Sequence, residues 1–185
     1  MVKVVFSKEE MYEINVKTIK DRGVTIDDIA QIAYNQQERY TNDIVYEDVV
    51  DSVKKILSLR NVFHNIQLGA KIDKLAEDGT IDGPIGDILR NDLGLFGIDE
   101  LCGLNVAGIY GTIGQTNFGD IDVNKPGIVS ILNESAKQKG VCHTFLDDVI
   151  GGVAAAASTR IAQVYNEKRA HEEIDWGETN EKCLY

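Results

Sequence analysis

Residues 151–157 are all glycine, valine or alanine, and this stretch constrains the fold more than any other part of the chain. Small side chains on a helix let neighbouring backbones come close together. Gly103, Ala107, Gly108 and Gly111 form a second stretch of this kind. We therefore expect helices rich in small residues at the centre of a helical bundle, whereas the more charged first 80 residues supply amphipathic helices around them.

Helix start and stop signals recur along the chain. Ser7 followed by Glu10 is a capping-box pattern, and Thr25 can cap a second helix with an apolar face. Expected helices cover about 8–23, 26–39, 46–79 with a break near Asn61, a short segment after Pro84, and then 99–114, 126–140 and 144–169, with a loop at 115–124. The sequence thus predicts an all-α fold, a single-domain bundle of about six or more helices around a glycine- and alanine-rich central helix.

The length of 185 residues favours one domain, which we assign to residues 1–170. Residues 171–185 are expected to form an acidic, flexible tail. Lys and Arg total 19 against 30 Asp and Glu, a formal net charge of −11. This balance argues against nucleic acid as a partner and against electrostatic adhesion to anionic lipid.

Cysteine usage and hydropathy bear on the compartment. Three cysteines, an odd number, fit a reducing cytoplasm better than a disulfide framework. No targeting segment is visible, and the uncharged run 101–119 carries too many polar residues for a membrane span. We expect a cytoplasmic protein with at most peripheral contact with the inner face of a membrane. The small-residue helices and the large amphipathic region also suggest a homo-oligomer.

Two acidic doublets have the same local form. Asp99-Glu100 lies one helical turn before Gly103, and Asp147-Asp148 lies one turn before Gly151 and Gly152. Buried carboxylates repel one another unless they are protonated or bound to a cation. The four acids therefore suggest a hard divalent metal such as Mg²⁺, which prefers oxygen ligands. The plainer explanation is that each doublet complements the dipole of a helix N-terminus.

A third acidic segment lies between the doublets. Asp122 is followed by Lys125 and Pro126, and proline suits the first turn of a helix. A lysine beside free helix N–H groups is a reasonable binding site for phosphate. An ordinary polar turn is the alternative.

Taken together, the three motifs resemble the phosphatidylglycerophosphatase A family, in which an Asp-Glu doublet, Asp-x-x-Lys-Pro and an Asp-Asp pair followed by glycine occur in this order. The similarity is strongest over about 97–162 and is greatest to the soluble branch, sometimes named after the low-temperature-requirement C protein. The membrane-embedded members have several spanning helices that this chain lacks. The resemblance implies an all-α phosphatase that uses Mg²⁺ to convert phosphatidylglycerophosphate to phosphatidylglycerol and inorganic phosphate in phospholipid biosynthesis.

The resemblance, together with the positions of residues near the motifs, suggests roles for particular side chains. Asp122, Lys125 and Asp147 are the expected catalytic residues, and Lys125, His143 and Asn117 the expected substrate contacts, with capping or packing as the plainer role for His143. The expected metal ligands are Asp99, Glu100, Asp122, Asp147 and Asp148. The substrate would be an anionic phospholipid or another small phosphomonoester. Attack by water and an aspartyl-phosphate route both remain open.

Two other functions fit parts of the sequence. A metal-binding helical scaffold or regulator would keep the carboxylates without the reaction. An all-α nucleotide pyrophosphohydrolase would use acids at 9–13 and 47–51, and it requires those acids to converge on one pocket.

Overall fold

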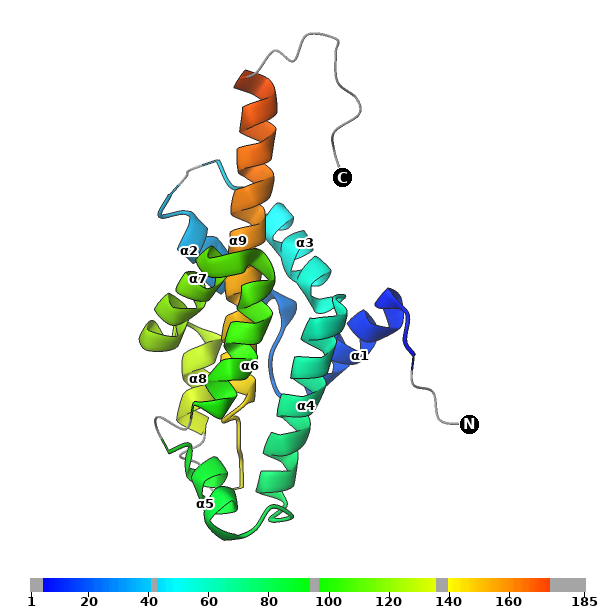
Figure 1. Ribbon diagram of the computed structural model, residues 1–185, viewed down its shortest axis with the longest axis vertical. Helices are drawn as coiled ribbons and strands as arrows, with labels where there is room; N and C mark the ends of the chain where they lie inside the picture. Colours follow the sequence, from blue (N-terminus) through cyan, green and yellow to red (C-terminus); the bar gives the residue numbers. More distant parts are fainter. Residues whose placement is uncertain (1–4, 41–42, 94–96, 136–139, 174–185) are drawn as a thin grey trace.

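The computed structural model describes residues 5–40, 43–93, 97–135 and 140–173, with side chains as far as 170 (Figure 1). Within these ranges the chain is helical and contains no strand, as the sequence predicts. The elements are α1 (Lys8–Asp21), α2 (Ile26–Gln37), α3 (Tyr46–Leu57), α4 (Arg60–Glu77), α5 (Gly83–Asn91), α6 (Ile98–Ala107), η1 (Gly108–Tyr110), α7 (Gly111–Asn124), α8 (Ile128–Ser135) and α9 (Leu146–Glu173).

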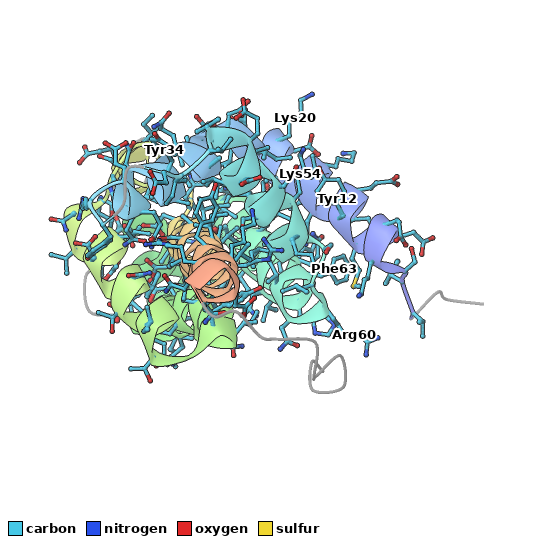
Figure 2. The ribbon with its side chains drawn as sticks, turned by 90° about the horizontal axis from the view of Figure 1, so that it is seen from above. Tyr12, Lys20, Tyr34, Lys54, Arg60 and Phe63 are labelled. Carbon is cyan, nitrogen blue, oxygen red and sulfur yellow. The ribbon has the colours of Figure 1, made fainter. Side chains whose placement is uncertain are left out.

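The long helix α9 forms the centre of the bundle. It contacts α2, α3, α4, α6, α7 and α8. Figure 2 looks almost along α9 and shows the other helices arranged around it. The small residues 153–157 are fully buried in the core, together with Val149 and Ile150. The expected glycine- and alanine-rich central helix is therefore confirmed.

Helices α6 and α9 approach each other through glycine. A Cβ atom on Gly152 would lie 2.5 Å from the carbonyl oxygen of Gly103, which is too close for any other residue. A Cβ atom on Gly103 would lie 2.4 Å from the ring of Phe118 on α7. Since each doublet lies one turn before one of these glycines, this contact brings the acidic first turns of α6 and α9 together.

The ends of the first two helices match their sequence signals. The Ser7 hydroxyl accepts the N–H of Glu10, whose carboxylate accepts the N–H of Ser7, and Thr25 makes the same reciprocal pair with Asp28. The break expected near Asn61 lies at 58–59, between α3 and α4.

The loop expected at 115–124 is wrong, because these residues belong to α7. A Cβ atom on Gly114 would lie 2.1 Å from the carbonyl oxygen of Ala107, so the glycine permits a tight turn between α6 and α7. Gly114, Phe118 and Ile121 are buried at helical spacing. The helix expected from 126 begins at Ile128 instead. Of the predicted tail over 171–185, the end of α9 extends to Glu173 and the remainder lies outside the described residues.

None of the described helices is both long enough and apolar enough to span a bilayer.

Candidate active site

Three carboxylates surround one ammonium group where α7 ends and α9 begins. The Lys125 Nζ atom lies 2.7 Å from Asp122 Oδ1, 3.2 Å from Asp147 Oδ2 and 3.3 Å from Asp148 Oδ1. We call these four residues the carboxylate–lysine cluster. It joins the second and third sequence motifs in space.

The backbone at Lys125 explains how its side chain reaches the cluster. Lys125 ends α7 in the left-handed conformation, with φ +43° and ψ 57°. Its N–H donates to the carbonyl oxygen of Ile121 at 2.7 Å, which closes the last turn. This cap is usually formed by glycine or asparagine. A lysine in this conformation folds back over the last turn to Asp122 and forward to α9.

The two doublets share one hydrogen-bonding pattern. The N–H of Asp148 donates to Asp147 Oδ1 at 2.9 Å, and the N–H of Glu100 donates to Asp99 Oδ1 at 2.9 Å. Both doublets lie in the first turn of their helix, where carboxylates also complement the helix dipole. Asp147, Asp148 and Asp99 are buried, whereas Glu100 is partly exposed.

Burial of so many acids shifts their ionisation. Burial raises the pKa of Asp148, and the charge of Asp147 raises it further. Burial also raises the pKa of Asp147, although the Lys125 ammonium opposes this shift, and it raises the pKa of Asp99. Burial alone would lower the pKa of Lys125, but the surrounding carboxylates more than reverse that effect. Three carboxyl groups thus share one ammonium, and protonation of the buried acids limits the negative charge around it.

The ammonium group lies among the carboxylates themselves. Within the described ranges, no three acidic, histidine or cysteine side chains are gathered closely enough to hold a metal ion in this arrangement. The Asp122 and Lys125 side chains are each 27% exposed, against 5% for those of Asp147 and Asp148. Solvent and solutes therefore reach the cluster from the side of α7.

Sequence reasoning missed Asp73, which supports the first turn of α9. Asp73 lies on α4 and is fully buried. Its two carboxylate oxygens accept the N–H groups of Phe145 at 3.1 Å and Leu146 at 3.0 Å. Burial raises the pKa of Asp73 to about 7. The available signal was its register, because Asp73 continues the buried face of α4 that contains Ile66 and Ala70.

Asp92 was missed as well. It ends α5 in the left-handed conformation, and its charge raises the pKa of both Asp99 and Asp147. No pattern in the sequence connects it to the three motifs.

The two remaining candidates make their hydrogen bonds elsewhere. The His143 Nδ1 atom is paired with the Ser135 hydroxyl at 2.5 Å, and burial with the charge of Arg22 lowers the pKa of His143 to about 4. The Asn117 side chain donates to the Thr159 hydroxyl at 2.9 Å. Thr159 lies roughly 16 Å along α9 from Asp148 at 1.5 Å per residue.

The acids required for a pyrophosphohydrolase site serve separate structural roles. Glu10 belongs to the α1 capping box, Asp48 accepts the Tyr165 hydroxyl at 2.8 Å, and Asp51 pairs with Lys54 at 3.0 Å. These contacts do not direct the acids to one pocket.

A family model described as phosphatidylglycerophosphatase A matches residues 43–163, which include all three motifs. This chain belongs to the phosphatidylglycerophosphatase A family. The uncharacterized protein YutG of Bacillus subtilis is 41% identical over 144 residues, covering 78% of this chain and 86% of YutG. The uncharacterized protein YpjQ of the same organism is 37% identical and covers 90% of this chain and 93% of YpjQ.

Solved structures identify the branch of the family that this chain is similar to. The low temperature requirement C protein of Listeria monocytogenes is 37% identical, with a TM-score of 0.80. The match covers 84% of this chain and 97% of the Listeria chain. A protein of unknown function from Bacillus stearothermophilus is 43% identical, with a TM-score of 0.78. The match covers 83% of this chain and 94% of the Bacillus stearothermophilus chain. The branch expected from the three motifs is confirmed.

Proposed function

We propose that this protein is a metal-dependent phosphomonoesterase that removes the terminal phosphate of phosphatidylglycerophosphate. The observation that carries the proposal is the carboxylate–lysine cluster, in which Asp122, Lys125 and Asp147 from two family motifs meet. The first motif lies nearby, because the charge of Asp99 also raises the pKa of Asp148.

The donor set has the chemistry that a hard divalent cation requires, although its carboxylates would have to draw together around the ion. Carboxylate oxygens are the ligands that Mg²⁺ prefers, and three carboxyl groups surround the single ammonium of Lys125. The residues that would hold the ion are Asp99, Glu100, Asp122, Asp147 and Asp148. When bound, a divalent cation polarises the phosphoryl group and lowers the pKa of coordinated water.

The protein's own groups supply the remaining chemistry. The Lys125 ammonium binds the phosphoryl oxygens and neutralises charge that develops on them. Asp122 is the most exposed carboxylate of the cluster and is therefore the best placed to reach a substrate. It acts either as a base that takes a proton from attacking water or as the nucleophile that forms an aspartyl-phosphate. In both routes the bond from phosphorus to the ester oxygen breaks, and that oxygen takes up a proton. In the second route water then cleaves the aspartyl-phosphate, which releases inorganic phosphate and restores the Asp122 carboxylate.

The anionic phospholipid substrate requires peripheral contact with the cytoplasmic face of a membrane. The net charge of −11 disfavours nucleic acid as an alternative partner. The homo-oligomer suggested by the sequence remains part of the proposal, and measurement of the mass in solution tests it.

Phosphate release from phosphatidylglycerophosphate in mixed micelles tests the proposed reaction. We expect release with Mg²⁺, none with chelator, and a loss of at least a hundredfold in Asp122→Asn and Asp147→Asn, as typical for general acid–base groups. The matched control is Asp120→Asn, because Asp120 lies on the same helix but contacts Gln36 and Arg39.

The outcomes separate the candidate functions. Equal losses in Asp120→Asn and Asp122→Asn would place the site elsewhere. No release by folded wild-type protein with Mg²⁺ would favour another phosphomonoester or the non-catalytic scaffold, in which Lys125 merely neutralises buried acids.

A further inference from the structure

A groove between α1 and α4 collects positive charge on a strongly acidic protein. It encloses about 430 Å³ and is open to solvent. Figures 1 and 2 place α1 on the side of the bundle opposite α7, so the groove shares no lining residue with the carboxylate–lysine cluster. The lining side chains are Thr18, Asp21, Arg22, Gln67, Ala70, Lys71 and Lys74.

The charges in the groove are unevenly matched. Asp21, the one acid among the lining residues, is already paired with Lys17 at 2.6 Å. Lys74 pairs with Asp78 at 3.1 Å and Glu77 at 3.4 Å. Lys71 is exposed, and the described part of the chain provides no acidic side chain within ion-pair distance of it. Its ammonium group is therefore available to an anion in solution.

Arg22 is a fixed cation in the wall of the groove. Its side chain is 14% exposed, and its Nη2 atom donates to Glu77 Oε1 at 2.6 Å and to the carbonyl oxygen of Cys142. Its Nε atom is buried and meets no acceptor among the described residues, so the donors left for a ligand in the groove are those of Nη1. A guanidinium held in place with donors to spare loses little conformational entropy when it binds an oxyanion.

Polar groups line the wall beside these cations. The Gln67 amide donates to the Thr18 hydroxyl at 3.0 Å and to Asn15 Oδ1 at 3.0 Å. The groove thus combines a free ammonium, a fixed guanidinium and a hydroxyl, which are the groups that proteins use to bind phosphate oxygens.

We propose that this groove binds a phosphate group, with Lys71 and Arg22 as its cations. The group is either the head group of an anionic lipid or a free phosphate compound. The proposal does not depend on the reaction at the carboxylate–lysine cluster.

Two probes distinguish the sources of phosphate. Pyrophosphate is titrated into isotope-labelled protein with chelator present, and the amide resonances of Ala70 and Lys71 are followed by NMR. Sedimentation with phosphatidylcholine vesicles, with and without phosphatidylglycerol, tests the lipid head group. Both experiments use the Asp122→Asn background, so failure of the proposed reaction leaves their result unaffected.

Charge variants test the site itself. One charge at contact distance in water contributes about fivefold to binding, so Lys71→Gln should weaken binding about fivefold and Lys71→Glu about 25-fold. Lys55→Gln and Lys55→Glu are the matched controls, because Lys55 is an exposed lysine of α3 outside the groove.

Each result decides the proposal. The proposal is supported if either probe binds, and if that binding weakens in the Lys71 variants but not in the Lys55 variants. The probe that binds then identifies the source of the phosphate group. Binding of neither probe, or equal weakening in both pairs of variants, overturns it.

Discussion

Replacing Gly152 with alanine should separate the two helices that carry the acidic doublets. The added methyl group would meet the backbone of Gly103, at 2.5 Å from its oxygen and 2.9 Å from its Cα atom. Ordinary contacts begin at 3.4 Å, so α6 and α9 must move apart by about 0.9 Å. A backbone obstacle cannot rotate aside as a side chain can.

The size of the effect follows from two opposing contributions. Overpacking of a core costs up to about 3 kcal/mol. Alanine recovers about 1 kcal/mol relative to glycine in a helix. We therefore expect a net loss of about 2 kcal/mol in the free energy of unfolding, or roughly 4–8 °C in Tm for a chain of this length.

Gly119→Ala is the matched control, because a Cβ atom at this position in α7 meets nothing within 4 Å. It should raise stability by about 0.5–1 kcal/mol. Urea unfolding followed by circular dichroism measures both variants, and phosphate release should fall only in Gly152→Ala. If Gly152→Ala is as stable as wild type, the close contact of α6 and α9 does not require glycine at position 152.

Two further predictions concern buried titratable groups. The pKa of Asp73 rises from 3.8 to about 7 on folding, so the folded chain takes up a proton and its contribution to stability declines as pH rises between those values. In urea unfolding with chelator present, the stability advantage of wild type over Asp73→Asn should therefore shrink between pH 5 and pH 8. An advantage that does not change with pH would contradict the prediction. Because burial and the charge of Arg22 lower the pKa of His143 to about 4, its ring NMR signals should stay those of neutral imidazole above pH 5. Titration near the usual His value of about 6.5 would show that the ring is not buried as described.

The parts of the fold that depend on local chemistry were predictable. Ser7 and Thr25 start helices through bonds that span three residues, so the sequence alone contains both partners. Helix α7 was not predictable in this way. In the sequence, Gly114 resembles a loop residue. Glycine is needed there because a Cβ atom would collide with the Ala107 carbonyl oxygen of the preceding helix, a contact that only the tertiary structure reveals.

The candidate active site was also predictable only in part. The doublets and Lys125 stand out as motifs, whereas the contact of Lys125 with Asp147 and Asp148 depends on a lysine in a left-handed conformation, which residue type does not predict. Asp73 was overlooked because an isolated acid on an amphipathic helix usually faces solvent. Its place on the buried face of α4 is visible only when the register of that helix is traced.

The central position of α9 also bears on the order of events during synthesis. Helices α2 and α3 pack against a helix that begins about 90 residues after α3 ends, at Leu146. A nascent chain grows from its N-terminus, so Val49, Val53 and their apolar neighbours stay without their final partner until α9 leaves the ribosome. Such long-range contacts slow folding. A chain interrupted before α9 therefore exposes the inner faces of its early helices and becomes a natural substrate for chaperones and proteases.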